Sequence, residues 1–325
     1  MKTRDKILRY IEKNEQSTIH SLANDLKISR QYAHRIISEL EETGLVKKMG
    51  IPPKVYYSIL DKIDETLSKS ISYEQEKFLQ EHFIIIDALG QLLEGLNAMK
   101  YWCSKQNLPL NKTIEEFILT RKKYLEYYNP NFLVDGLSKL KGTNGIEQIG
   151  VDCLFYLDFY AIERFGKTRL GTLMHYAKQG QNKFLMKIIV NEIKQRIVKL
   201  IEEEAVTAIL YVPPTIKRKT QIMDFLKTQL AIDLPSIKVE KIKTQIIVPQ
   251  KALSKIFERV ANAKNTFIVP RQQDYEHVLI IDDAIGSGAT INEIAIKIKD
   301  KKLANKITGL AITGSYKGFD VISEL

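Results

Sequence analysis

One short segment of the sequence combines two adjacent carboxylates with a loop of small and hydroxyl residues. The apolar residues 278–281 lead directly into Asp282 and Asp283, and a loop of small and hydroxyl residues follows before a helical pattern begins. Carboxylates at the end of a parallel strand accept hydrogen bonds from ribose hydroxyls, directly or through a bound Mg2+. Small residues let backbone N–H groups approach a phosphate, and the N-terminus of the next helix attracts the anion. The segment therefore predicts a phosphate- and ribose-binding loop; solvated acids in an ordinary strand-turn-helix unit are the alternative.

The same segment resembles the phosphoribosyl-pyrophosphate motif of type I phosphoribosyltransferases. In that motif four apolar residues and two acids precede a loop of TTGxT type, and here Gly286 and Ser287 stand where threonines are usual. The resemblance implies a parallel-sheet type I phosphoribosyltransferase fold, of the α/β class, in residues 151–325. It also implies that Asp282 and Asp283 are catalytic and hold Mg2+. The loop residues that would bind phosphoribosyl pyrophosphate or a nucleotide are Gly286, Ser287, Gly288, Ala289 and Thr290.

Three further segments are similar to the ComF-like (competence protein F) branch of that fold, and their order is that of the family. Segment 169–185 has Lys178 at a family lysine, and segment 212–221 has prolines, basic residues and a glutamine in the family's order. Segment 248–267 matches the family series at Gln250, Leu253, Arg259, Asn262 and Phe267. The resemblance implies anion contacts from Pro213, Pro214, Thr215, Lys217, Arg218, Lys178 and Arg259. Taken alone, the basic run 217–219 is equally consistent with a solvated turn.

The implied reaction is displacement of pyrophosphate from the anomeric carbon of ribose by a nucleophile, often nitrogen. Its transition state would resemble an oxocarbenium ion, as in glycosyl transfer. The sequence departs from the family in two ways: it has no four-cysteine zinc ribbon, and its basic loop lacks the Arg-Gly-Phe-Asn order before the glutamine. Both departures bear on catalysis more than on ligand binding.

Short apolar runs alternate with helical stretches around these segments. Residues 205–213, 277–283 and 306–314 have the composition of buried parallel strands, and residues 220–230 and 290–302 have helical patterns. This order predicts a parallel α/β sheet with right-handed crossovers. Ligands of such sheets bind at the carboxyl ends of the strands, which is where the acid pair lies.

Residues 1–60 have the pattern of a winged helix-turn-helix domain. Apolar spacing predicts helices over residues 3–13, after Thr18 and after Ser29, and residues 45–59 predict a hairpin with a proline-containing turn. The third helix resembles the recognition helix of winged-helix regulators, so we expect binding to double-stranded DNA; a protein-interaction module is the alternative. The expected DNA contacts are Ser29, Arg30, Gln31, Tyr32, His34 and Arg35 in that helix and Lys47, Lys48 and Lys54 in the wing.

Residues 61–150 are expected to form a helical connecting region. Segments 61–70, 74–104 and 112–128 have helical apolar spacing, and residues 140–150 have the composition of a loop or linker. No motif with a chemical role occurs here. We interpret the apolar faces as a core or as the interface of a homodimer.

Composition limits the partners and the compartment. The net charge of +10 consists of +4 on residues 1–60, −2 on residues 61–150 and +8 on residues 151–325, which favours polyanions in general. The most apolar stretch, residues 83–99, contains two acids, so we expect no membrane span. Cys103 and Cys153 make neither a disulfide framework nor a zinc ribbon, which fits a reducing cytoplasm.

Two functions remain open at this point. The first is a regulator that binds phosphoribosyl pyrophosphate or a nucleotide and changes its affinity for DNA, and the resemblance to purine repressors, which join the same two folds, favours it. The second is an active phosphoribosyltransferase or related glycosyltransferase, guided by its winged helix, in nucleotide metabolism, DNA uptake or phage defence. An inactive scaffold is a third reading, against which the intact acid pair argues.

Overall fold

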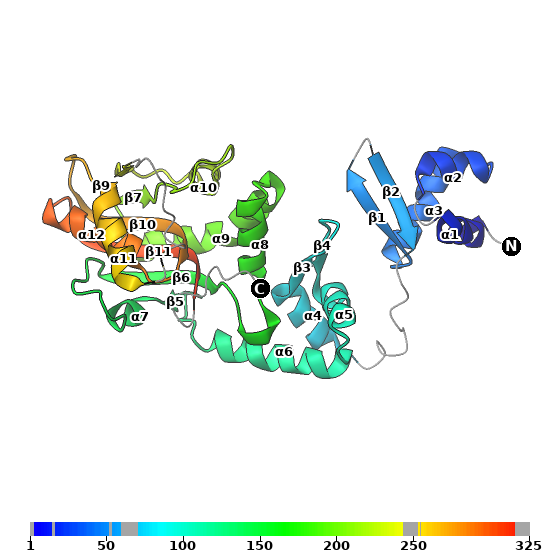
Figure 1. Ribbon diagram of the computed structural model, residues 1–325, viewed down its shortest axis with the longest axis horizontal. Coiled ribbons are helices and arrows are strands. Elements are labelled where there is room, and N and C mark those ends of the chain that lie inside the picture. The colour runs from blue at the N-terminus through cyan, green and yellow to red at the C-terminus, as the bar shows by residue number, and fades with distance from the viewer. Residues whose placement is uncertain are drawn as a thin grey trace. The chain divides into compact units, whose positions relative to one another are not determined.

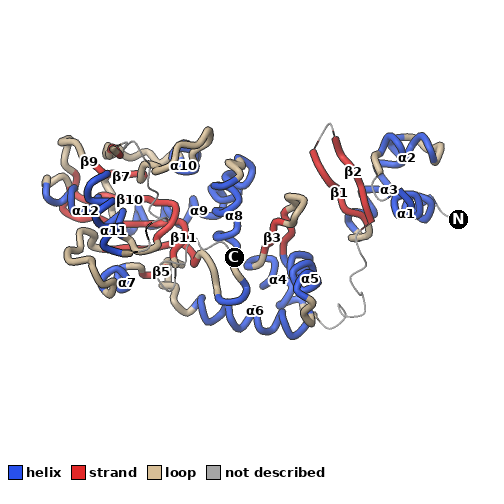
Figure 2. The backbone as a smooth tube through the Cα atoms, viewed as in Figure 1, coloured by secondary structure: helices blue, strands red, loops and turns tan. Residues whose placement is uncertain are grey.

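The computed structural model describes residues 3–14, 17–51, 54–59, 71–242, 253 and 255–315. These residues belong to two compact units, Met1–Ile114 and Glu115–Leu325 (Figure 1). The first unit is rich in short helices and hairpins, whereas the second contains a five-stranded sheet with its helices (Figure 2).

The first unit begins with the winged helix that the sequence predicts. Its elements are α1 (Thr3–Asn14), α2 (Ile19–Asp25), α3 (Arg30–Glu42), β1 (Val46–Ile51) and β2 (Lys54–Ile59). The side chains of Thr18 and Ser29 cap α2 and α3, accepting the N–H groups of Ser21 at 3.1 Å and Tyr32 at 3.2 Å. Ile7, Ile11 and Leu40 are fully buried in a core that the hairpin closes. The three helices and the hairpin are therefore confirmed.

The prediction of one helix over residues 74–104 is wrong for the middle of this range. The chain instead forms α4 (Tyr73–His82), a hairpin of β3 (Ile84–Ile86) and β4 (Leu92–Glu94), and α5 (Gly95–Gln106). Three consecutive isoleucines favour a strand, because β-branched side chains lose freedom in a helix. The carboxylate of Asp87 then stabilises the turn by accepting the N–H groups of Leu89 and Gln91, both at 2.8 Å. The connecting region is therefore not purely helical.

The rest of the connecting region reaches into the second unit. Helix α6 (Leu110–Leu125) confirms most of the helical pattern of residues 112–128, and α7 (Leu137–Lys141) takes in the first two residues of the expected loop 140–150. Between them, β5 (Val134–Asp135) pairs antiparallel with the sheet of the second unit, which thus takes in residues before 151. Segment 61–70 lies outside the described residues.

The sheet of the second unit has the strand order β5-β6-β11-β10-β7. Strands β6 (Cys153–Phe159), β7 (Ala208–Tyr211), β10 (Tyr275–Ile285) and β11 (Ala304–Gly314) are mutually parallel where they pair. The predicted parallel α/β sheet is confirmed, and three of these strands coincide with predicted runs. Residues 277–281 of β10 are all buried, as expected for a strand covered on both faces.

Further helices and a small two-stranded sheet belong to the same unit. The helices are α8 (Arg169–Gln179), α9 (Lys183–Glu203), α10 (Ile222–Leu230), α11 (Ile256–Thr266) and α12 (Ala289–Asp300), with a short 3-10 helix η2 (Glu163–Phe165). Strands β8 (Glu240–Lys241) and β9 (Phe267–Ile268) pair antiparallel in a two-stranded sheet, with α11 between them in the chain. Helices α10 and α12 confirm the helical patterns that follow β7 and β10.

A buried ion pair ties the second half of α6 to the sheet. The guanidinium of Arg121 donates to both carboxylate oxygens of Asp158 in β6, at 2.9 and 3.1 Å, and both side chains are more than nine-tenths buried. The hydroxyl of Tyr128 and the N–H of Phe159 also donate to this carboxylate. Burial by itself opposes the charged form of Arg121, but the Asp158 carboxylate holds the pKa of Arg121 above its usual value.

We expect Arg121→Met to lower the free energy of unfolding by about 3 kcal/mol, because it breaks the ion pair of the buried Asp158 carboxylate. The matched control is Lys123→Met on the same helix, which breaks an exposed pair with Glu163 and should cost less than about 1 kcal/mol. Adding Asp158→Leu to Arg121→Met should recover part of the loss. Urea denaturation followed by circular dichroism measures all three, and equal destabilisation by the two single changes would contradict the argument.

Candidate functional site

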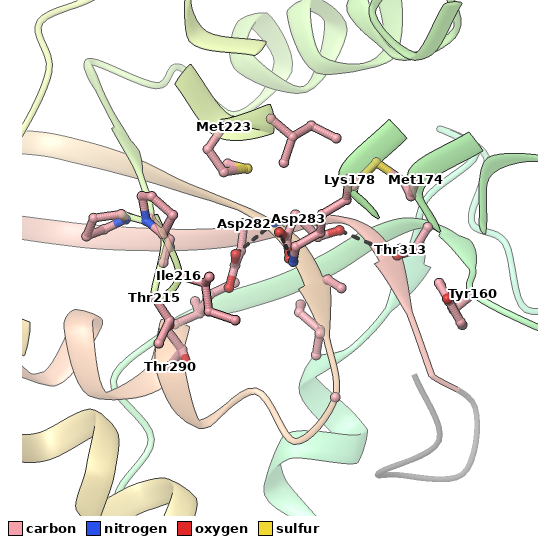
Figure 3. Close-up of a pocket in the computed structure, with 18 of the residues that line it drawn as sticks. Tyr160, Met174, Lys178, Thr215, Ile216, Met223, Asp282, Asp283, Thr290 and Thr313 are labelled. Atoms are coloured by element: carbon pink, nitrogen blue, oxygen red, sulfur yellow. Dashed lines mark hydrogen bonds and ion pairs between the residues drawn. The ribbon is translucent and has the colours of Figure 1, made fainter. Parts of the chain in front are cut away.

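A cavity of about 460 Å³ lies at the carboxyl ends of the parallel strands (Figure 3). Tyr160 follows β6, residues 212–216 follow β7, residues 282–285 end β10, and Thr313 lies near the end of β11; all of these line the cavity. Helices α8, α10, α11 and α12 supply further lining residues. The cavity therefore occupies the edge at which parallel sheets bind ligands.

The structure brings most of the predicted ligand contacts into this one cavity. The acid pair and the loop 286–290 lie beside residues 213–215, which follow a different strand. Lys178 reaches the cavity from α8, Arg218 from the loop after β7, and Arg259 from α11. Lys217 is not among the described lining residues. Residues that are up to 112 positions apart in sequence, such as Lys178 and Thr290, thus share one site.

The acid pair lies at the centre of the site. The N–H of Asp283 donates to the carboxylate of Asp282 at 2.8 Å, and the ammonium of Lys178 forms an ion pair with the carboxylate of Asp283. The Thr313 hydroxyl donates to the Asp283 carbonyl at 3.4 Å. Burial, together with the neighbouring Asp283 carboxylate, raises the pKa of Asp282 to about 7. The pair can therefore accept hydroxyl groups, coordinate a cation, or exchange a proton near neutral pH.

The glycine loop meets the N-terminus of α12. Gly288 is the N-cap residue with a φ of +79°, a conformation that glycine adopts readily and most residues avoid. A Cβ at this position would lie 2.8 Å from Cδ1 of Leu140, so a larger residue would also need room. The N–H of Ala289 donates to the Ser287 hydroxyl at 3.4 Å, and no side chain caps the helix. The backbone N–H groups of the first turn are thus presented as an anion-binding site requires.

The loop after β7 is held by the end of α8 and the turn after it. The side chain of Arg218 donates to the Gln179 side chain at 3.3 Å, and the N–H of Thr220 donates to the Gln181 side chain at 2.8 Å. Gln221, the glutamine of the family pattern, donates to the carbonyl of Ile216 within the loop, at 3.0 Å. These contacts set the distance between the loop and α8, which carries Lys178.

Arg259 is the most buried of the cavity's arginines. Its Nε donates to the carbonyl of Leu253 at 2.8 Å, and only 8% of the residue is exposed. Burial lowers the pKa of Arg259. Gln250, which the family series also includes, lies outside the described residues.

Several residues in or beside the cavity were missed at the level of sequence. Tyr160 shares a hydrogen bond of 3.0 Å with Nδ1 of His175, and burial raises the pKa of Tyr160 to about 12. Met174 and Met223 form an apolar wall next to Lys178 (Figure 3). Lys241 of β8 contacts the loop after β7 by donating to the Thr215 hydroxyl at 2.6 Å. None of these residues belongs to a recognisable local motif, so no sequence signal identifies them.

The donor set fits a magnesium ion that a ligand helps to hold. Mg2+ prefers oxygen ligands and is commonly bound by one or two carboxylates together with waters and substrate phosphates. Asp282 and Asp283 supply two such carboxylates. Among the described residues, no group of three or more His, Cys, Asp and Glu side chains is placed to hold a metal. The site therefore fits a ligand-completed magnesium ion better than an all-protein cage.

In the winged helix, the predicted DNA contacts share the outer face of α3. Ser29, Arg30, Gln31, His34 and Arg35 are exposed, whereas Ala33, Ile36, Ile37 and Leu40 face the core. The Arg30 guanidinium bonds Nδ1 of His20 at 2.7 Å, and that of Arg35 lies 4.9 Å from the centre of the half-buried Tyr32 ring. In the wing, Lys48 is exposed and Lys47 half-buried. The side chain of Lys54 lies outside the described residues.

Comparison with known protein families identifies this module. Residues 2–47 match the family model described as winged helix-turn-helix DNA-binding. The chain carries an N-terminal winged-helix DNA-binding domain. A comparison with curated proteins found no match. None of the helices that the structure describes has the length and apolarity needed to cross a bilayer.

The exposed face of α3 yields a prediction for the DNA-binding domain. Arg30→Ala with Arg35→Ala should weaken retention of duplex DNA in gel shifts by at least tenfold, since arginines at the start of a recognition helix reach bases and phosphates. The control is Lys6→Ala with Arg9→Ala, which removes two exposed basic residues of α1 and the same charge. Equal losses in the two double variants would indicate non-specific attraction, and no loss in the first would place the interface elsewhere.

Proposed function

We propose that this protein is a DNA-binding regulator whose second unit binds phosphoribosyl pyrophosphate or a nucleotide in a pocket of the type I phosphoribosyltransferase kind. The observation that carries the proposal is the convergence of three features in one cavity. These are the acid pair, the glycine loop at the N-terminus of α12, and the cations Lys178, Arg218 and Arg259. Anionic, hydroxyl-rich ligands match this combination, because each charged or polar group of the ligand finds a partner of the opposite kind.

The proposed binding mode assigns one part of the ligand to each feature. The 5-phosphate lies on the backbone of residues 286–290, where N–H groups and the helix dipole favour an anion. The ribose hydroxyls donate to Asp282 and Asp283. The pyrophosphate lies against residues 213–215, with Arg218 beside it. When bound, Mg2+ would be held by the two carboxylates and would neutralise phosphate charge.

The apolar wall of the cavity extends the proposal to nucleotides. Met174, Ile222 and Met223 line the cavity together with the charged groups. Flexible methionine side chains pack well against flat rings. A ligand that carries a base on its ribose would therefore bury the base on this wall.

An active phosphoribosyltransferase is the second candidate function, and the environment of Asp282 favours it. Without a bound cation, burial and the Asp283 carboxylate raise the pKa of Asp282 to about 7, so Asp282 can take the proton that a nitrogen nucleophile loses when Mg2+ is held by Asp283 and the ligand. In that reaction the nitrogen bonds to the anomeric carbon, the bond from that carbon to the pyrophosphate oxygen breaks, and the proton passes to Asp282. Pyrophosphate leaves with the bonding electrons.

Calorimetry with the full chain tests ligand binding. Phosphoribosyl pyrophosphate in excess Mg2+ should bind the wild-type protein, and Asp282→Asn with Asp283→Asn should weaken binding at least 100-fold, since each charged hydrogen bond contributes about 1.5–3 kcal/mol. Asp233→Asn with Glu240→Gln removes the same charge from exposed positions and should leave binding unchanged. Absence of wild-type binding at millimolar ligand would sink the proposal. Pyrophosphate release in the presence of nitrogen acceptors would assign the transferase function instead.

A regulator must also couple its two ligands. If phosphoribosyl pyrophosphate changes the affinity for DNA, DNA changes the affinity for phosphoribosyl pyrophosphate by the same factor. We expect roughly a 5- to 150-fold effect, which corresponds to about 1–3 kcal/mol of coupling. DNA is titrated with and without saturating ligand at fixed salt and free Mg2+, and the Asp282→Asn, Asp283→Asn variant controls for ionic effects. Identical dissociation constants in the wild type would exclude this ligand as the effector.

A further inference from the structure

Lys241 lies beside the cavity and contacts two of the residues that line it, Thr215 and Phe267. It comes from β8, whose pairing with β9 sets Lys241 opposite Phe267, and its ammonium lies 4.4 Å from the centre of the Phe267 ring. The side chain is half-buried and donates to the Thr215 hydroxyl at 2.6 Å. Among the described residues, no carboxylate lies within ion-pair distance of it. Lys178, by contrast, is paired with Asp283.

The contact with Thr215 has a consequence for the loop after β7. A hydroxyl group has one hydrogen to donate and two lone pairs that accept. Because the Thr215 oxygen accepts from Lys241, its own hydrogen is available to a ligand in the cavity that Thr215 lines. The ammonium has two further hydrogens of its own. Lys241 and Thr215 therefore form a donor pair at the place assigned above to the pyrophosphate.

A half-buried ammonium without a carboxylate partner loses solvation free energy. An anion that binds the ammonium offsets this loss. Burial lowers the pKa of Lys241, and the nearby Asp282 carboxylate partly offsets this effect. The glycine loop connects two other elements, β10 and α12, so a phosphate bound there makes its contacts separately from Lys241. Two anion-binding places, each with its own donors, thus border the same acid pair.

We propose that Lys241 is the specificity-determining cation by which the site distinguishes a ligand with a pyrophosphate group from one with a single phosphate. The inference rests on the proposed function, because it uses the same cavity. Lys241 binds the pyrophosphate through its ammonium and positions the Thr215 hydroxyl to donate to the same group. The contacts of the 5-phosphate with the glycine loop do not involve Lys241.

Calorimetry with three probes in excess Mg2+ tests this assignment on the full chain. The probes are phosphoribosyl pyrophosphate, inorganic pyrophosphate and ribose 5-phosphate. Lys241→Met should weaken the binding of phosphoribosyl pyrophosphate and of inorganic pyrophosphate by about 10- to 100-fold, the effect of losing a charged hydrogen bond. The affinity for ribose 5-phosphate should change by less than about twofold. Lys241→Arg should keep the preference for pyrophosphate. Lys238→Met, an exposed lysine of the same segment, is the matched control and should alter none of the three.

The outcomes separate this inference from the function on which it rests. Selective loss of the two pyrophosphate probes in Lys241→Met, with ribose 5-phosphate retained, supports it. Equal loss of all three probes would reveal a purely structural role and overturn it, as would unchanged binding of all three. Wild-type protein that binds ribose 5-phosphate but neither pyrophosphate probe would overturn it as well. Failure of the wild type to bind any probe would refute the proposed function itself.

Discussion

The parallel alignment of β7, β10 and β11 is the constraint on which the cavity depends. Ile281 lies opposite Tyr211 on one side and Leu310 on the other, so the three strands end at the same edge of the sheet. The residues at the ends of these strands therefore line one cavity: the acid pair of β10, the loop 212–216 after β7 and Thr313 of β11. An antiparallel partner would send one of these segments to the opposite edge and divide the site.

The electrostatics of the cavity follow from this crowding. Burial of the Asp282 carboxylate, together with repulsion from the adjacent Asp283 carboxylate, raises the pKa of Asp282. Lys178 offsets the charge of Asp283 through an ion pair, whereas Lys241 acts on Asp282 only through space. The site thus combines paired and unpaired charges. A ligand with both hydroxyl and phosphate groups can bind the carboxylates and the ammonium groups at this edge without disturbing the packing of the sheet.

The two units present different kinds of polar surface, an exposed helix face in the first and a concave cavity in the second. In the winged helix, α3 uses one face for the core and leaves the other polar and exposed, which suits a long, uniformly charged partner such as DNA. In the second unit, the polar groups converge in a concave site of limited volume, which suits a small ligand. A regulator that senses a nucleotide precursor requires both kinds of surface in one chain, and so does a transferase that is guided to DNA.

The sequence by itself determined the features that depend on neighbours along the chain. The caps at Thr18 and Ser29, the strand and loop of residues 278–290, and helices α10 and α12 all follow from local patterns, because their hydrogen bonds join residues a few positions apart. Only the tertiary structure decided the rest. The hairpin β3–β4 interrupts an apolar spacing that also fits a helix, and β6 is largely buried along its length and so shows no alternation. Tyr160 and His175 reach the cavity, and Lys241 reaches its lining residue Thr215, only through the packing of distant elements. No spacing in the chain encodes such contacts, since they are created when the sheet and its helices assemble.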